Sequence, residues 1–189
     1  MDYQYNTAMP IARRLADILQ PACQQLHIAG SLRRRKTTVH DIEIVCQPHI
    51  ESATDLFGNI LSDYTPQIDA ILQDLTDAGD LVAIKGGPRY RQFAVQPLGI
   101  PLDLFIVIPP AQYGNILAIR TGPAHYSHWL VTRKQKGGAL PSHLTARDGA
   151  IWENDRLFPA PTEADFYAIL GIPVPDPPIR EPAWGRSTP

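Results

Sequence analysis

The chain has 189 residues, of which 44% are hydrophobic and 19% charged, and its formal net charge is −2. This length allows one compact domain or two small lobes around a substantial core, and the weak negative charge excludes binding to polyanions through bulk charge alone. Cys23 and Cys46 are the two cysteines, and their apolar contexts favour reduced core thiols over a disulfide framework or a zinc site. No apolar run is long enough to span a bilayer, and the N-terminus lacks a signal-peptide pattern, so we expect a soluble, cytoplasmic protein.

The first predicted elements are a helix and two strands. Apolar residues at helical spacing predict a helix over residues 9–26, with Pro10 in its first turn. A short apolar segment, residues 27–30, comes before a run of four basic residues that we assign to a turn or a short helix. Residues 41–48 are rich in Ile and Val and predict a strand.

The middle of the chain predicts a helix followed by three strands. We interpret residues 49–65 as an irregular connection with one short helical stretch. Apolar spacing then predicts an amphipathic helix over residues 67–78, which ends at Gly79. Segments rich in strand-forming residues follow at 81–85, 90–96 and 100–108. Together these elements indicate an α+β fold with a mixed or mainly antiparallel sheet flanked by helices.

A pair of prolines at 109–110 marks a boundary, after which a smaller lobe is expected. Residues 112–136 predict two helices joined around 121–123, and the Asp-Gly pair at 148–149 predicts a hairpin.

The end of the chain predicts one more helix and a Pro-rich segment. Thr162 and Asp165 have the spacing of a capping box at the start of that helix. Residues 173–189 are rich in proline and are expected to be extended.

Three carboxylates lie on predicted strands whose other face is apolar. Strand alternation directs Asp41 and Glu43 to one face of the first strand, and it places Asp103 in the same way on a later one. Acids on adjacent strands would each be driven to hold a proton unless cations neutralised them. Mg²⁺ shares hard oxygen ligands with substrate phosphates, and a pair of such ions can clamp both oxygens of an in-line displacement at phosphorus. The pattern therefore predicts a site for two Mg²⁺ ions, with Mn²⁺ as a possible substitute.

The basic turn supplies groups that suit a phosphate. Gly30 and Ser31 end the segment before it, where backbone N–H groups and the Ser31 hydroxyl could cradle phosphate oxygens. Arg34 offers a planar fork of donors for the same oxygens. Phosphate and metal are thus expected to meet at one place.

The order G-S-x-x-R, then Asp-x-Glu, then "LDLF" resembles the nucleotidyltransferase superfamily, and within it the family X DNA polymerases related to DNA polymerase beta. "RTGPAHYSHWL" at 120–130 resembles that family's Thr-Gly segment beneath the incoming nucleotide, and residues 133–181 resemble its C-terminal subdomain. The resemblance covers nearly all of residues 8–181 and is greatest to the minimal viral form, which has palm and C-terminal subdomains only.

The resemblance implies a fold and a division of the chain. It implies a polymerase beta-like palm with a mixed sheet over residues 1–109 and a small α+β C-terminal subdomain over residues 110–181 that binds nucleotide and DNA. Residues 182–189 are left as a tail.

The resemblance also implies roles for individual residues. Asp41, Glu43 and Asp103 would be the catalytic metal ligands, and Ser31 and Arg34 would contact the triphosphate near Gly30. Arg120, Thr121 and Gly122 would line the nucleotide and sugar pocket, with a cis peptide after Gly122. Apart from the resemblance, Arg133, Lys134 and Lys136 are expected at the end of a helix, where positive charge favours the helix dipole, and they are the residues to which we assign contact with DNA phosphates.

The implied function is template-directed addition of dNMP from dNTP to a primer 3′-OH in short-gap repair, by a monomer that binds primer-template or gapped DNA and has no membrane partner. Several positions depart from the family: Glu43 stands where Asp is usual, His40 where a glycine or small residue is common, and Ile119-Arg120 where an aromatic pair is common. Two alternatives remain open. One is a template-independent nucleotidyltransferase acting on RNA, protein or a small molecule, and the other is a non-catalytic nucleic-acid-binding accessory.

Three groups of residues can be explained by an ordinary surface or core position without a role in function. Arg89 and Arg91 suit the flank of the site and a solvent-facing strand equally well. His125, His128 and His143 lack a convincing fourth zinc ligand. Tyr126 and Trp129 are expected in the core rather than against nucleotide.

Overall fold

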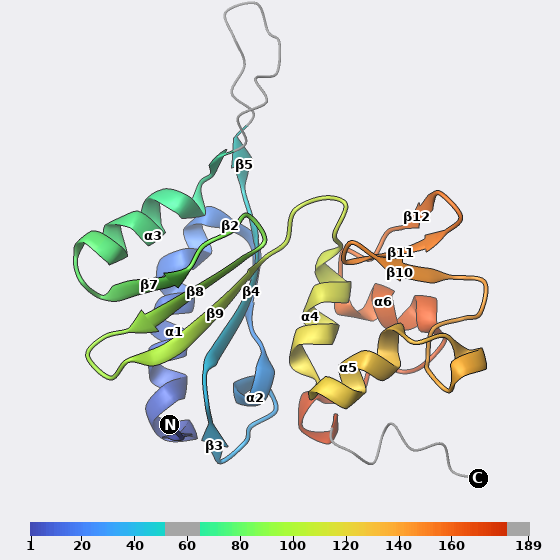
Figure 1. Cartoon of the computed structure of the whole chain (residues 1–189), viewed down its shortest axis with the longest axis horizontal. Coiled ribbons are helices and arrows are strands. Elements are labelled where there is room, and N and C mark those ends of the chain that lie inside the picture. The colour runs from blue at the N-terminus through green and yellow to red at the C-terminus, as the bar shows by residue number, and fades with distance from the viewer. Residues whose placement is uncertain (52–64, 181–189) are drawn as a thin grey trace, which may run out of the picture.

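The computed structural model describes residues 1–51 and 65–180, which form two lobes (Figure 1). The N-terminal lobe is built on a five-stranded sheet. In spatial order its strands are β2 (Cys23–Ile28), β4 (Ile42–Pro48), β9 (Ile100–Ile106), β8 (Tyr90–Val95) and β7 (Leu81–Lys85). β4 and β9 run parallel, and the other neighbours are antiparallel. The predicted mixed sheet is therefore confirmed.

Two helices cover one face of this sheet. Apolar residues of α1 (Tyr5–Leu19) and α3 (Ile68–Asp77) share a core with the strand residues Ile44 and Leu102, both of which are fully buried. Short pairs border the lobe, β1 (Tyr3–Gln4) with β3 (Thr38–Val39) and β5 (Ile50–Glu51) with β6 (Thr65–Pro66). The predicted short helical stretch and irregular connection over 49–65 lie mostly outside the described residues, as does the segment 181–189.

The first predicted helix is wrong at both ends. α1 begins at Tyr5, so Pro10 lies inside the helix rather than in its first turn; it stays exposed, where water can satisfy the carbonyl that its missing N–H leaves unpaired. The helix ends at Leu19, a short 3-10 helix η1 (Gln20–Ala22) follows, and residues 23–26 belong to β2. The apolar positions continue without a break because the helix and the strand after it both face the same core.

The C-terminal lobe contains the elements that the sequence predicts there. Two helices, α4 (Tyr113–Thr121) and α5 (Ala124–Val131), precede the hairpin strands β10 (Thr145–Arg147) and β11 (Ala150–Glu153). β12 (Arg156–Phe158) completes a three-stranded sheet, and α6 (Glu163–Leu170) follows. The capping box of α6 is confirmed, because the Thr162 and Asp165 side chains each bond the other residue's backbone N–H.

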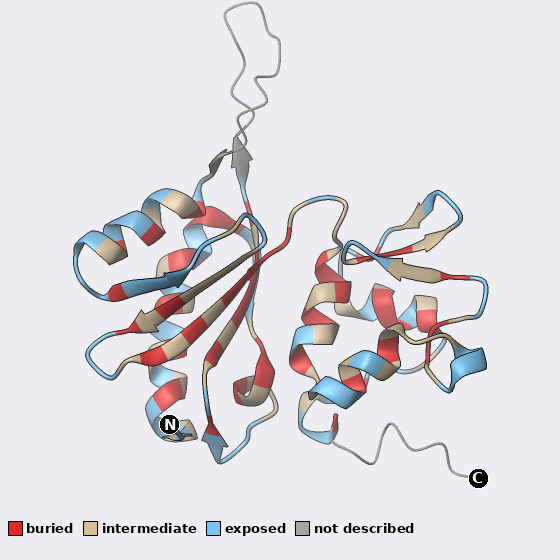
Figure 2. Ribbon diagram, in the orientation of Figure 1, coloured by how far each residue is buried: buried red, intermediate tan, exposed pale blue. Residues whose placement is uncertain are grey.

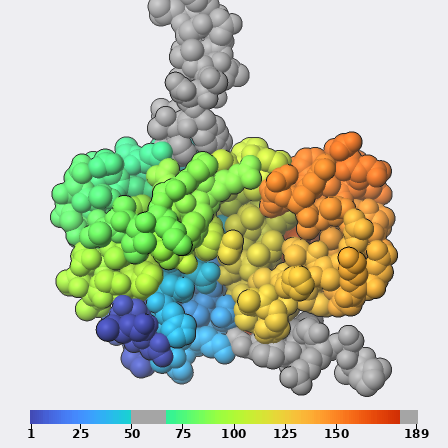
Figure 3. Space-filling view, in the orientation of Figure 1, coloured from blue at the N-terminus to red at the C-terminus, as the bar shows by residue number. Residues whose placement is uncertain are grey.

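The two lobes pack together through α4. Tyr113 and Leu117 of α4 form a small core with Val45 of β4 and Phe105 of β9. Figure 2 shows that buried positions predominate along these strands, and Figure 3 shows the lobes in contact along a line that includes the yellow segment around residue 120. α4 therefore belongs to the C-terminal lobe but also packs on the sheet of the N-terminal lobe. The domain boundary at residues 109–110 stays a prediction.

Two further expectations concern the backbone and the membrane. In the described residues, cis peptide bonds precede Pro97 and Pro110, so the expected cis bond between Gly122 and Pro123 is not found. None of the helices in those residues combines the length and apolarity needed to cross a bilayer.

Candidate active site

The three predicted carboxylates lie on the sheet face opposite α1 and α3. Glu43 of β4 and Asp103 of β9 are register partners on adjacent parallel strands, and Asp41 stands just before β4. All three are half-buried, whereas Ile42 and the other alternate positions point into the core and are fully buried. The predicted alternation is therefore confirmed.

Burial and neighbouring acids raise the pKa values of Asp41 and Glu43. Burial and then the charge of Asp41 raise the pKa of Glu43 to about 7, although Arg120 and Arg34 oppose the shift. Burial and then the charge of Asp103 raise the pKa of Asp41. The cluster holds more negative charge than its two neighbouring arginines neutralise, which is the condition in which a carboxylate site gains from bound cations.

Gly30 allows the Glu43 side chain to lie against the backbone of α2 (Gly30–Arg33). Its φ is +59°, in the left-handed region, and a Cβ built there would overlap the Glu43 Oε2 atom. A side chain at this position would therefore displace the carboxylate as well as strain the backbone.

A cavity of about 530 Å³ connects Asp41 and Glu43 to the basic turn and to the C-terminal lobe, and Asp103 does not line it. Of the nine residues that the sequence assigned to metal or nucleotide, six line it. They are Ser31, Arg34, Asp41, Glu43, Arg120 and Gly122. The Ser31 hydroxyl oxygen is buried and has no hydrogen-bond partner, so it is a polar group that a ligand in the cavity could satisfy.

Thr121 does not line this cavity. It is fully buried at the end of α4, where its hydroxyl donates to the Leu117 carbonyl and accepts from Arg33 Nη1 at 2.6 Å. Its carbonyl accepts from Arg34 Nη1, also at 2.6 Å. Its proposed contact with sugar stays a prediction, and its observed contacts are with the basic turn of the other lobe.

Arg33 links the basic turn to the C-terminal lobe, a role that the sequence analysis missed. Besides Thr121, its guanidinium binds both carboxylate oxygens of Glu163 at the start of α6, at 3.0 and 2.8 Å. Glu163 also accepts from Arg180, whose side chain is fully buried. Arg33 therefore joins the basic turn to the C-terminal lobe, while Arg34, next to it, lines the cavity.

Arg120 is held at the cavity wall by an aromatic ring. Its guanidinium lies 4.0 Å from the centroid of Phe105, and the charge of Arg120 lowers the pKa of Glu43 against the larger effect of burial. Ile119 and the first turn of α5, through Ala124 and Ser127, complete this wall. The sequence analysis did not assign these α5 residues to the site. Their position directly after the Thr-Gly segment is the one signal in the sequence that could have identified them.

The predicted DNA-contacting residues differ in their surroundings. Lys134 and Lys136 are exposed on the short 3-10 helix η2 (Lys134–Lys136), which follows α5. Arg133 instead donates to the Leu144 carbonyl and to Thr145 Oγ1, so it holds the segment before the hairpin. Contact of these three residues with DNA stays a prediction.

The structure shows where Arg91 and Tyr126 lie, two residues for which the sequence left a functional role open. Arg91 forms an ion pair with Asp69 of α3 at 2.8 Å, which places its head group on the sheet face away from the acids. Tyr126 is fully buried in the C-terminal core, and its hydroxyl lies 2.9 Å from that of Tyr167. The core interpretation of Tyr126 is therefore confirmed.

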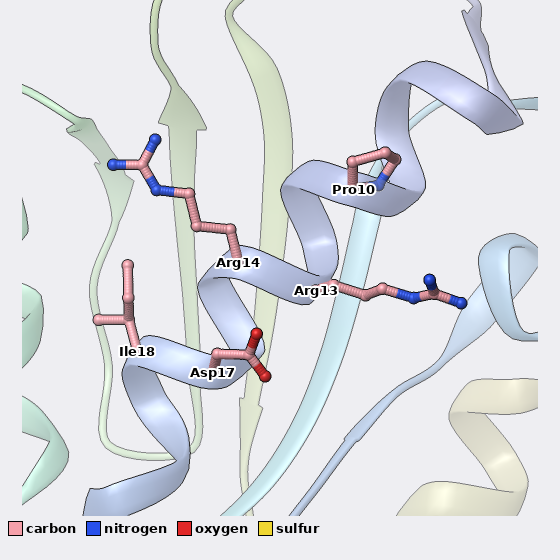
Figure 4. A pocket seen from close by; sticks show the side chains of 5 residues that line it. All are labelled: Pro10, Arg13, Arg14, Asp17 and Ile18. Atoms are coloured by element: carbon pink, nitrogen blue, oxygen red, sulfur yellow. The ribbon is translucent and has the colours of Figure 1, made fainter.

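A second hollow, of about 520 Å³, lies on the outer side of α1 (Figure 4). In Figure 4, Arg13 and Arg14 point to different sides of the helix and do not converge on a common point. α1 covers the sheet face that carries the apolar core, opposite the carboxylates. This hollow is therefore separate from the candidate site.

Comparison with known proteins shows a distant similarity to a DNA polymerase. No family model matches the chain. The chain is 28% identical to DNA polymerase lambda of Rattus norvegicus over 175 residues, which covers 80% of this chain and 28% of that protein. The chain thus spans little more than a quarter of the length of this relative. The similarity supports a relationship with the family X polymerases and, with it, a nucleotidyltransferase-like function.

Proposed function

We propose that this chain is a template-directed DNA polymerase that adds dNMP from dNTP to a primer 3′-OH, acting on short gaps. The observation that carries the proposal is the cavity in which a buried, unpartnered Ser31 hydroxyl faces the same space as Asp41 and Glu43. The Ser31 hydroxyl can donate a hydrogen bond to a phosphate oxygen, and the nearby acids of raised pKa favour bound cations. This combination suits a polyphosphate that carries metal ions. The similarity to DNA polymerase lambda agrees with this choice.

The carboxylates supply the hard oxygen ligands that Mg²⁺ prefers. Asp41, Glu43 and Asp103 would hold two ions, which, when bound, supply charge neutralisation and alignment of the reacting oxygens. In residues 1–51 and 65–180, no three acid, His or Cys side chains are close enough to hold a metal ion by themselves. Such a site needs phosphate oxygens and water to complete it, as is usual for Mg²⁺.

The protein groups around the cavity would bind and orient the nucleotide. Ser31 and the backbone N–H groups of α2 would donate to phosphate oxygens, and Arg34 is fixed at the wall by its bond to the Thr121 carbonyl. The first turn of α5 brings the positive end of a helix dipole to the same wall. Positioning and electrostatics of this kind account for most of the rate enhancement in phosphoryl transfer.

Gly30→Ala tests the packing of the Glu43 carboxylate. We expect primer extension to fall roughly a hundredfold because Glu43 must move by an ångström or more. Gly79→Ala is the matched control, since Gly79 also has a left-handed φ, +79°, but has nothing within 4 Å of an added Cβ. Both variants should lose thermal stability through backbone strain, and only Gly30→Ala should lose activity. Equal activity of the two variants would contradict the close packing of Glu43.

The proposed function is tested by extension of a labelled primer, alone, with a recessed end and in a short gap. Each dNTP and rNTP is added in turn with Mg²⁺ or Mn²⁺, and EDTA provides the metal-free control. Incorporation that follows the template base and stops with EDTA supports the proposal. Untemplated tailing would point instead to a template-independent nucleotidyltransferase. DNA binding that is equally tight in EDTA, without extension under any condition, would point to a non-catalytic accessory.

A further inference from the structure

Asp103 has two hydrogen-bond donors on the neighbouring strand β8. Tyr90 Oη lies 2.9 Å from Asp103 Oδ1, and Gln92 Nε2 lies 2.8 Å from the same oxygen. Gln92 is the register partner of Asp103 across the antiparallel pair, and Tyr90 is two residues away on the same face of β8. Both donors are therefore positioned by the sheet rather than by a loop.

The two bonds distinguish the two oxygens of this carboxylate. A carboxylate oxygen has about two lone-pair directions, and two donors occupy both of them at Oδ1. Oδ2 is then the oxygen through which Asp103 can accept a further bond. The Asp103 side chain is only half-buried, and Glu43 is its register partner on the adjacent strand β4.

We propose that Tyr90 and Gln92 are positioning residues that fix Asp103 as a one-oxygen ligand, offering Oδ2 alone to a divalent cation. This inference rests on the proposed function, because it concerns how the same acid meets the cation. Fixing the rotation of the carboxylate removes conformational freedom that would otherwise be lost when the cation binds.

The Tyr90 ring is itself held in place. It packs on Phe105 with ring centroids 5.3 Å apart, and Phe105 carries the Arg120 guanidinium of the nucleotide cavity on its ring. A chain of contacts thus runs from Arg120 at the cavity wall to Asp103.

The test uses Tyr90→Phe, which keeps the ring, Gln92→Met, which keeps the length and volume, and the double variant. Mn²⁺ binding is measured by electron paramagnetic resonance with a non-hydrolysable dNTP analogue present, and extension by single-turnover kinetics. We expect each single variant to weaken Mn²⁺ binding and slow extension by up to about tenfold, and the double variant by about a hundredfold. The KM for dNTP should stay near the wild-type value, since neither residue lines the nucleotide cavity.

Tyr3→Phe and Gln73→Met are matched controls on β1 and α3, and neither should change Mn²⁺ affinity. Wild-type extension combined with unchanged Mn²⁺ affinity and rate in the folded double variant would overturn the inference and leave the proposed function standing. Weaker Mn²⁺ binding in the double variant, without any extension by the wild type, would support the positioning role and reject the polymerase function. Failure of the wild type to bind Mn²⁺ would overturn both.

Discussion

Asp103→Asn is expected to slow primer extension by about a thousandfold or more. The variant keeps the shape of the side chain, and the Asn carbonyl oxygen should take the place of Oδ1 because only an oxygen can accept from Tyr90 and Gln92. The amide nitrogen then occupies the place of Oδ2, where it can neither bind a cation nor accept a proton. The loss should therefore appear in the rate of the chemical step at saturating dNTP.

The same variant should fold as well as the wild type. Removing one negative charge relieves its repulsion of Asp41, so the melting temperature of the metal-free protein should be unchanged or higher. Asp74→Asn, on the exposed side of α3, controls for the loss of an acid elsewhere and should retain full activity. If Asp103→Asn extended primers at more than about a tenth of the wild-type rate, Asp103 would not belong to the reacting centre.

Local patterns predicted the features that depend on neighbouring residues in the chain. The period-two alternation around Asp41 and Glu43 identified the acid face of β4, and the spacing of Thr162 and Asp165 identified the start of α6. Alternation and capping are determined within a few residues, so no knowledge of the tertiary structure was needed. The first helix was predicted too long because apolar spacing cannot show where a buried helix gives way to a buried strand.

Features that depend on strand register or on contact between the lobes could not be predicted in this way. Gln92 reaches Asp103 only because β8 and β9 pair in one particular register. The sequence analysis assigned the phosphate to Arg34 and gave its neighbour Arg33 no role of its own. Their roles separate because the short helix α2 turns Arg33 toward Glu163, a residue 130 positions away. The run of basic residues therefore predicted a phosphate site without showing that Arg33 and Arg34 also bond to the C-terminal lobe.

Glu163→Ala is expected to destabilise the protein by ~3–5 kcal/mol, because it leaves buried positive charge without its partner. The Glu163 carboxylate accepts from Arg33 at 3.0 and 2.8 Å and from Arg180 at 2.6 Å, and the Arg180 side chain is fully buried. Although burial favours the neutral acid, the bonds from Arg180 and Arg33 lower the pKa of Glu163, so it is charged at neutral pH. Urea unfolding at pH 7 measures the loss. Asp155→Ala, which removes the exposed partner of Arg147, is the control and should cause no measurable change.

A double-variant cycle separates the buried charge from simple loss of packing. Arg180→Met removes the fully buried cation, so Glu163→Ala should cost much less in the Arg180→Met background than in the wild type. Additive effects of the two substitutions, or an unfolding midpoint of Glu163→Ala equal to that of the wild type, would show that the buried pair of Glu163 and Arg180 does not stabilise the C-terminal lobe. Glu163→Ala should also affect function. In this variant Arg33 loses its carboxylate partner, and with it the bond between the basic turn and α6. Extension by a folded Glu163→Ala protein should therefore show a raised KM for dNTP, while the chemical step at Asp103 is affected less.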